Sequence, residues 1–419
     1  MRGGSRIREA ESHQDLNIIH AAQLVTVRGP RRTRRGSELS ELGIIRDGAV
    51  RIRDGVIQWA GPTDRLPDKH APEFDAGGKV ILPGFVDSHT HAVFSRTRAD
   101  EFEWRIQGTP YMDILARGGG ILSTVKAVRE TAPLRVQFPD RFFEFGTTTI
   151  EAKSGYGLNL ETEIRILEAI RSVEKLEAVP TYLGAHALPP EFRDDRDGFV
   201  DQVIQDLETI HSRKLAEFCD VFVEPGAFNA NEARRIVAAA RSLGLGIKLH
   251  VDEFESSGGA GLAVEVGATS ADHLGAIAEA DIPRIAASDV VATLLPATLF
   301  MLGQGHYAPA RKLIESGAAV ALATDFNPGT SPTLNMQFVL SLACTQMRMM
   351  PAEAIVAATM NGACAVHREQ RLGSIEPGKD ADMAVYDLSD YREIAYFAAV
   401  NFCVATFKRG ELVYSRSIT

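Results

Sequence analysis

Residues 80–91 read VILPGFVDSHTH, an apolar run that ends in polar residues. The run at 80–86 predicts a β-strand, and His89, Thr90 and His91 come directly after it. In a barrel of parallel strands, side chains at the C-terminal strand ends converge on one mouth, where catalytic residues lie. This stretch therefore predicts a strand whose C-terminal end places polar side chains at the mouth of a barrel.

Further apolar runs rich in Val, Ile and Thr follow up to about residue 330, separated by longer amphipathic or Ala-rich stretches. This alternation is typical of repeated βα units and a parallel sheet. Helices are predicted at 160–175 and 230–243. We expect an α/β fold in which eight such units close a (β/α)₈ TIM barrel over residues 83–371. The eight predicted strands are 80–86, 147–152, 178–184, 220–224, 246–250, 269–272, 290–295 and 319–324.

The two ends of the chain have a different pattern. Short runs alternate with Gly, Asp and Pro turns, which favours antiparallel β-structure. Because a closed barrel returns the chain to its starting point, we expect residues 16–82 and 372–419 to form one small β-sandwich domain. Residues 1–15 are expected to be a disordered extension. The predicted terminal strands are 18–27, 48–53, 55–60, 381–387, 404–409 and 411–414.

The composition limits the classes of protein to which the chain can belong. It has 419 residues, 45% of them hydrophobic and 24% charged, with a formal net charge of −10. These proportions are those of a soluble globular protein, and no run of about 18 apolar residues suggests a membrane span. The negative charge argues against binding to nucleic acid or to an anionic membrane. The first residues lack the apolar core of a secretory signal, so we expect a cytoplasmic protein.

For two groups of residues, the sequence predicts no function. The cysteines lie too far apart for a zinc finger or a disulfide framework, so we expect buried thiols. A short run of arginines is expected to be a solvated loop. These residues are Cys219, Cys344, Cys364 and Cys403, and Arg31, Arg32, Arg34 and Arg35.

Histidines or an aspartate follow five of the predicted barrel strands. In an extended segment, residues i and i+2 point the same way, so His89 and His91 can bind one metal ion together. An HxH pair alone is often a pair of surface or core histidines. With His250 and Asp325 added, three neutral imidazoles and one carboxylate suit Zn²⁺ or Fe²⁺ and leave room for a water molecule. The residues at the strand ends are His89, His91, His186, His250, His273 and Asp325.

The segments that carry these residues resemble a known family. The ILPGFVDSHTH stretch at 81–91 resembles the signature of the amidohydrolase superfamily, and GSIEPGKDAD at 373–382 resembles its return from the barrel to the β domain. From about residue 45 to the end, the chain is similar to the imidazolonepropionase family of that superfamily. The segments that carry this narrower resemblance are GGGILST at 118–124, KSGYGL at 153–158, GAHA at 184–187, KLHVDEF at 248–254, DHL at 272–274 and TDFNPG at 324–329.

The resemblance implies a metal-dependent hydrolase of histidine degradation. Its small-molecule substrate, 4-imidazolone-5-propanoate, has a carboxylate tail, and opening of the cyclic amide gives N-formimidoyl-L-glutamate. The implied cofactor is one divalent metal, zinc or iron, held by His89, His91, His250 and Asp325. The implied substrate contacts are Arg98, Tyr111, Tyr156, His186, Glu253, Asn327, Gly329 and Thr330.

The chemistry of several of these residues agrees with their implied roles. Arg98 can offer a fork of N–H donors to a carboxylate, and Tyr111 and Tyr156 can offer hydroxyl groups. A buried tyrosine can also do no more than satisfy a backbone carbonyl. Glu253 follows His250 by three positions, close enough to exchange a proton with a metal-bound water, and His273 is a second catalytic candidate. Each of the last two could instead orient a metal ligand.

The number of metal ions can also be argued. Dinuclear members of the superfamily usually bridge two ions with a carboxylated lysine on the fourth strand, but here that strand ends in Val223, Glu224 and Pro225. We therefore expect one metal. Lys153, on the second strand, is the lysine that would have to serve a second ion. Its alternative role is an ion pair with Glu151 or Glu224.

Two competing functions stay open. A deaminase of the same superfamily, acting on a purine, pyrimidine or triazine ring, could use His250, Glu253 and His273 equally well, although a neutral ring does not call for Arg98. The chain could also be a non-catalytic barrel that serves in binding or assembly. Members of the superfamily are often dimers, so a homodimer is open as well.

Overall fold

The computed structural model describes residues 15–109, 113–114 and 117–416. Tyr111 and residues 1–14 lie outside the described residues, so the expectations for them stay predictions. Asp15 is the first described residue, and its carboxylate accepts a hydrogen bond of 2.6 Å from Arg51 Nη2.

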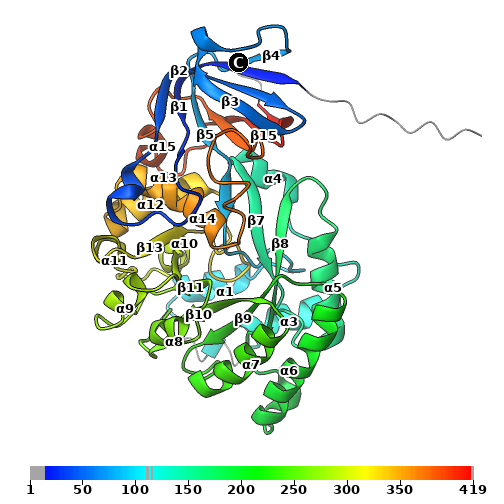
Figure 1. Ribbon diagram of the computed structural model, residues 1–419. Coiled ribbons are helices and arrows are strands. Elements are labelled where there is room, and N and C mark those ends of the chain that lie inside the picture. Colours follow the sequence, from blue (N-terminus) through cyan, green and yellow to red (C-terminus); the bar gives the residue numbers. More distant parts are fainter. Residues whose placement is uncertain (1–14, 110–112, 115–116, 417–419) are drawn as a thin grey trace, which may run out of the picture.

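Eight parallel strands in sequential order form the inner layer of the barrel (Figure 1). The first and last strands meet through the segments that follow them. The backbone N–H of Asp325 donates to His89 O at 3.1 Å, and that of His91 donates to Phe326 O at 2.9 Å. The predicted TIM barrel is confirmed. Its strands are β6 (Phe85–Asp87), β7 (Thr147–Lys153), β8 (Glu177–Ala185), β9 (Phe218–Val223), β10 (Gly246–Val251), β11 (Ser270–His273), β12 (Val291–Leu294) and β13 (Ala319–Leu322).

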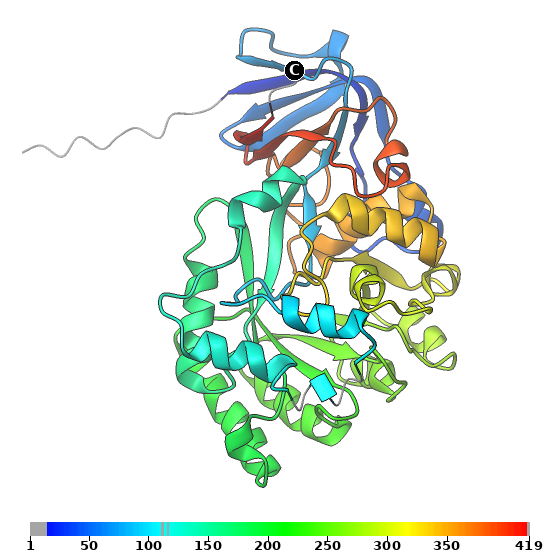
Figure 2. The same cartoon turned by 180° about the vertical axis from the view of Figure 1, so that it is seen from behind.

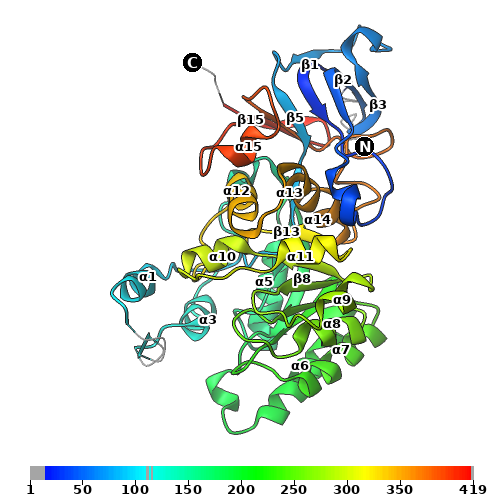
Figure 3. The same ribbon diagram turned by 90° about the vertical axis from the view of Figure 1, so that its left-hand side faces the viewer.

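Helices surround these strands, and Figure 3 shows α1 and α3 standing out from one side of the barrel. The two predicted helices form as α5 and α7, although α5 ends at Arg171, earlier than expected. The described helices are α1 (Ala99–Ile106), α3 (Ile121–Arg129), α4 (Pro139–Glu144), α5 (Leu160–Arg171), α6 (Arg196–Ser212), α7 (Ala230–Ser242), α8 (Gly259–Glu265), α9 (Ile282–Ala286), α10 (Pro296–Met301), α11 (Ala310–Glu315), α12 (Met336–Met347), α13 (Pro351–Ala358), α14 (Met360–Cys364) and α15 (Glu393–Tyr396). None of the helices formed by the described residues has the length and apolar character needed to span a bilayer.

The terminal segments form a second sheet above the barrel, in which N-terminal and C-terminal strands lie together (Figure 2). The strands are joined in one continuous mixed sheet rather than in the two sheets of a sandwich. This sheet encloses its own apolar core, since Phe74 and Phe407 from its two halves pack edge to face at 5.0 Å between ring centroids. Its strands are β1 (Leu16–Val25), β2 (Ile44–Arg53), β3 (Val56–Pro62), β4 (Glu73–Asp75), β5 (Val80–Pro83), β14 (Met383–Tyr386), β15 (Cys403–Lys408) and β16 (Glu411–Ser415).

The stretch at 80–86 is two strands rather than the single one predicted. β5 pairs with β1 and β14 in the terminal sheet, whereas β6 pairs with β7 in the barrel. The chain passes from one sheet to the other at Gly84, which is closely packed against Thr148. A Cβ atom on Gly84 would lie 2.3 Å from Thr148 Oγ1, so a larger residue would push the two segments apart.

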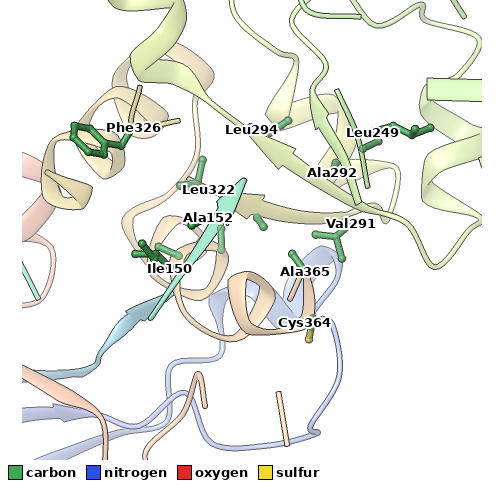
Figure 4. Packing of buried hydrophobic residues seen from close by; sticks show 14 of the residues in the cluster. Ile150, Ala152, Leu249, Val291, Ala292, Leu294, Leu322, Phe326, Cys364 and Ala365 are labelled. Atoms are coloured by element: carbon green, nitrogen blue, oxygen red, sulfur yellow. The ribbon is translucent and has the colours of Figure 1, made fainter. Parts of the chain in front are cut away.

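The apolar core lies mainly between the barrel strands and the surrounding helices. Figure 4 shows part of it, with side chains of β7, β10, β12 and β13 near Cys364 and Ala365. The four cysteines are free thiols, and three of them, Cys219, Cys364 and Cys403, are buried as predicted.

The arginine segment at 31–35 is only in part the solvated loop that the sequence predicts, because Arg31 and Arg32 are exposed but Arg34 is not. Arg34 is fully buried and donates to the carbonyl oxygens of Val27 and Pro30. The amide of Asn361 in α14 holds this segment against the barrel. Asn361 Oδ1 accepts the backbone N–H of Arg34 at 2.7 Å, and its Nδ2 donates to Arg34 O and to Val320 O. The segment therefore links the terminal sheet to the barrel.

Replacement of Asn361 tests this link. Asn361→Ala leaves up to three buried backbone groups without a partner, so the free energy of unfolding should fall by at least about 1–3 kcal/mol in denaturant titrations. Asn231→Ala, at an exposed position of α7, should change it by less than about 0.5 kcal/mol. Equal effects of the two substitutions would mean that the amide of Asn361 does not hold the segment.

Candidate active site

The six residues predicted at the strand ends lie together at one mouth of the barrel, and all are buried. The imidazole rings are in mutual contact, with centroids 4.5 Å apart for His89 and His250 and 5.3 Å apart for His91 and His250. The structure therefore brings together the side chains that the sequence placed on five different strands.

The four predicted metal ligands present their donor atoms to a common point. His91 Nε2 lies 3.2 Å from His250 Nε2, and Asp325 Oδ1 lies 3.6 Å from Nε2 of both His89 and His91. Two overlapping groups of three residues have donor atoms close enough to hold an ion. They are His89, His91 and Asp325, and His89, His250 and His273.

The surroundings of the histidines fit a divalent metal. His89 Nδ1 donates to Asp272 at 2.6 Å and His250 Nδ1 donates to Asp220 at 3.1 Å, which directs Nε2 of both rings into the mouth. His89 Nε2 is buried and has no hydrogen-bond partner among the described residues. Burial lowers the pKa of His89 and of His91, and neighbouring cationic groups act in the same direction. Neutral imidazoles oriented by carboxylates are the usual environment of metal-binding histidines.

Asp325 completes the set from the loop after β13. Its Oδ2 accepts a hydrogen bond of 2.6 Å from Thr298 Oγ1 on α10, and burial raises its pKa to about 6. Asp325 and His273 both have left-handed backbone conformations, with φ of 54° and 80°. Such strain in residues other than glycine is often stored at functional sites. Thr298 could not be predicted as part of the site, because it belongs to no recognisable motif.

Glu253 and His273 form a pair beside the metal ligands. Glu253 Oε1 lies 3.6 Å from His273 Nδ1. Burial raises the pKa of Glu253 well above its ordinary value, and the carboxylates of Asp325 and Glu224 raise it further. Burial lowers the pKa of His273. The pair thus combines a carboxyl group that binds a proton more tightly than usual with a neutral imidazole.

Glu224, at the end of β9, holds the segment that carries Glu253. Its carboxylate accepts the backbone N–H groups of Glu253, Phe254 and Glu255 at 2.8–3.1 Å. Of the two carboxylates suggested as ion-pair partners of Lys153, the structure shows Glu151, whose Oε1 accepts a hydrogen bond of 2.7 Å from Lys153 Nζ.

Tyr156 and His186 line the mouth next to His91. The ring centroids of His91 lie 5.8 Å from Tyr156 and 5.1 Å from His186. His186 Nδ1 donates to Gly155 O at 3.0 Å. The loop that carries Tyr156 is held by buried Glu163, whose carboxylate accepts three backbone N–H groups at 2.7 Å, from Gly155, Gly157 and Leu158.

Arg98 lies near this loop, but its fork of donors is not free as the sequence suggests. Its Nε and Nη2 donate to the two carboxylate oxygens of Glu101 at 2.9 and 2.6 Å, because a largely buried guanidinium needs a counter-charge. Its Nη1 packs against Gly329, where a Cβ atom would lie only 2.1 Å away. Arg105 donates from Nη2 to Gly329 O at 2.9 Å, so a second arginine stands beside the first. Glu101 and Arg105 were missed because an ordinary amphipathic helix carries similar charges.

Asn327 and Thr330 shape the loop that contains Gly329. Asn327 Oδ1 accepts the backbone N–H groups of Gly329 and Thr330 at 2.8 and 2.7 Å, and its Nδ2 donates to Asp325 O. The amide of Asn327 is thus used within its own turn, which fixes the loop between Asp325 and Arg98.

Comparison with known proteins places the chain in a family. Residues 80–413 match the Amidohydrolase family. Proteins named imidazolonepropionase from Solibacter usitatus and Geobacillus thermodenitrificans are 47% and 44% identical to the chain, covering 96% and 95% of it and 99% and 97% of their own lengths.

Solved structures with the same fold are more distant in sequence. An Escherichia coli guanine deaminase has a TM-score of 0.71 at 17% identity and covers 97% of this chain and 100% of its own. A zinc-bound adenosine deaminase from Xanthomonas campestris has a TM-score of 0.68 at 19% identity, with 96% and 93% covered. These similarities concern the fold alone. The full-length similarity to the curated relatives is closer, and by it the chain belongs to the imidazolonepropionase family of the amidohydrolases.

Proposed function

We propose that this chain hydrolyses the cyclic amide of 4-imidazolone-5-propanoate to N-formimidoyl-L-glutamate, a step of histidine degradation. The observation that carries the proposal is the buried cluster of histidines and Asp325, next to Glu253, in a chain 42–47% identical to proteins named imidazolonepropionase. The direct test is turnover of synthetic 4-imidazolone-5-propanoate, followed by loss of its ultraviolet absorbance.

Side chains of the mouth supply the proton transfers that ring opening needs. His89, His91, His250 and Asp325 would hold a divalent metal, which would lower the pKa of a water toward about 7 and supply positive charge for the developing oxyanion. Glu253 takes up a proton as the water attacks the ring carbonyl and passes it to the departing ring nitrogen. Its raised pKa suits this exchange. His273 directs Nδ1 toward Glu253, which leaves Nε2 to donate to the oxyanion.

The tail of the substrate is assigned to the region of Arg98, Tyr156 and Gly329. Arg98 is paired with Glu101, whereas Arg105 donates to the backbone carbonyl of Gly329 and has no carboxylate partner among the described contacts, so its positive charge is available to a propionate. Burial raises the pKa of the Tyr156 hydroxyl group. The charge of Arg98 acts in the opposite direction, so the two side chains lie close enough to interact. His186, Asn327 and Thr330 are proposed to complete the substrate contacts.

Some expectations stay predictions. They are the choice of zinc or iron, a homodimer, a cytoplasmic location, the limits of the two domains and the role of Tyr111.

Metal content is the first test of the site. The two groups of converging ligands share His89 and surround one point, so the purified protein should hold about one equivalent of transition metal per chain. Elemental analysis measures this directly. Two equivalents, or full activity without metal, would contradict the proposed site.

Glu253→Gln tests the proton carrier. The substitution keeps the size of the side chain but removes its proton exchange, so kcat should fall by about 10²–10⁴-fold while the metal content stays the same. Glu255→Gln, in the same loop, is the control and should keep kcat within about threefold, because Glu255 contributes only its backbone N–H to the site. Loss of metal from Glu253→Gln would place Glu253 among the ligands instead.

Arg98→Ala tests the tail pocket and separates the hydrolase from a deaminase. Charged hydrogen bonds contribute about 1.5–3 kcal/mol, so kcat/KM for 4-imidazolone-5-propanoate should fall by about 10- to 150-fold. Arg96→Ala removes an arginine that is exposed and paired with Asp100, and it should have little effect. An unchanged kcat/KM for Arg98→Ala, together with deamination of a neutral ring by the wild-type protein, would favour the deaminase.

A further inference from the structure

The interior of the barrel below the site is filled with charged side chains. Barrel interiors are usually packed with Val, Ile and Leu. Here five ionisable residues, contributed by four strands, are buried with no more than 1% of their surface exposed. They are Glu151 and Lys153 on β7, Asp220 on β9, Lys248 on β10 and Asp272 on β11. Burial of so many charges is costly unless each has a partner, so their arrangement calls for a physical reason.

Lys153 lies at the centre of this group. Its Nζ donates to Glu151 Oε1 and to Asp220 Oδ2, both at 2.7 Å, and lies 3.6 Å from Asp272 Oδ2. One ammonium group thus contacts three carboxylates from three different strands.

Two of these carboxylates also bind metal-site histidines, and in Asp272 the same oxygen, Oδ2, faces both Lys153 and His89. Asp220 accepts the Nδ1 proton of His250, and Asp272 accepts that of His89. His250 and His89 come from opposite parts of the barrel, since His250 lies in β10 and His89 follows β6. Lys153 is therefore the group through which the orientations of two predicted ligands are connected.

Lys153 itself is poorly suited to bind a metal. A carboxylated lysine carries a negative charge, and at this position it would lie against Glu151, Asp220 and Asp272. Burial opposes the positive charge of Lys153, but Asp220 and Glu151 outweigh this effect and raise its pKa above the ordinary value. The side chain stays an ammonium group.

Lys248 offers a matched comparison. It is equally buried and lies in the same barrel interior, but its Nζ donates to Ser270 Oγ at 2.7 Å and Ala365 O at 3.2 Å. Its distance to Asp272 is 3.8 Å, and it contacts neither Asp220 nor Glu151 among the described contacts.

We propose that Lys153 is a positioning residue for the metal centre, which holds Asp220 and Asp272 so that His250 and His89 direct Nε2 at the metal. The proposal rests on the metal-dependent function proposed above. Residues that orient metal ligands typically contribute about 10- to 100-fold to metal affinity. Lys153 should contribute to metal affinity by a similar factor, although it does not contact a metal-binding side chain directly.

The test is the dissociation constant for Zn²⁺ of the full chain, measured after removal of bound metal by titration against a competing chelator. Lys153→Met should raise the dissociation constant by about 10- to 100-fold, whereas Lys248→Met should change it by less than about threefold. The visible spectrum of the Co²⁺ form provides a second measurement, because it reports the ligand geometry. It should change in Lys153→Met and stay unchanged in Lys248→Met.

Two more conservative substitutions keep the test decisive if Lys153→Met does not fold. Lys153→Gln retains an N–H donor and should weaken Zn²⁺ binding less than Lys153→Met does, and Lys153→Arg, which retains the charge, should come closest to the wild type. A folded Lys153 variant without the charge that keeps wild-type Zn²⁺ affinity would overturn the proposal. So would failure of every Lys153 variant to fold while Lys248→Met folds, because the lysine would then serve the fold alone. Zn²⁺ binding is measured without substrate, so an inactive wild-type protein would refute the proposed reaction and leave this inference standing.

Discussion

The barrel closes along one seam, and three of the four predicted metal ligands lie on it. His89, His91 and Asp325 belong to the two segments that follow β6 and β13, and these segments are joined by backbone hydrogen bonds. Below them, Asp87 accepts both the backbone N–H and the hydroxyl of Thr324. Closure of the barrel and assembly of the ligands are therefore one event. The site cannot form unless the first and last strands meet.

Buried carboxylates hold two of the loops at the mouth of the barrel. Glu224 and Glu163 each accept three backbone N–H groups from a loop at the mouth, one loop carrying Glu253 and the other Tyr156. Hydrogen bonds to a charged acceptor hold these loops more firmly than hydrogen bonds to a neutral acceptor would. The orientation of the reactive side chains thus comes from carboxylates that never touch the substrate.

Several features could be predicted from the sequence because they depend on local patterns. The order of the barrel strands follows from apolar runs, and the ligand set follows from polar residues at strand ends. Asp220 as a second partner of Lys153, and Asn361 as the partner of Arg34, could not be predicted, since only the tertiary fold brings these residues together. The change from the terminal sheet to the barrel at Gly84 could not be predicted either, because β5 and β6 read as one apolar run in the sequence. Arg98 was correctly placed near the mouth, but its pairing with Glu101 depends on the packing of α1. Charged residues inside apolar strands, such as Lys153 and Asp220, were the available signal for the buried network.

The central claim is that one metal ion is held by His89, His91, His250 and Asp325. Anomalous X-ray scattering from crystals of the full chain, recorded at the zinc and iron absorption edges, tests it most directly. The account predicts a single peak about 2.0–2.1 Å from an Nε2 atom of each of the three histidines, with Lys153 outside the coordination sphere. A peak bound by His273 in place of His91, or a second peak at Lys153, would contradict it.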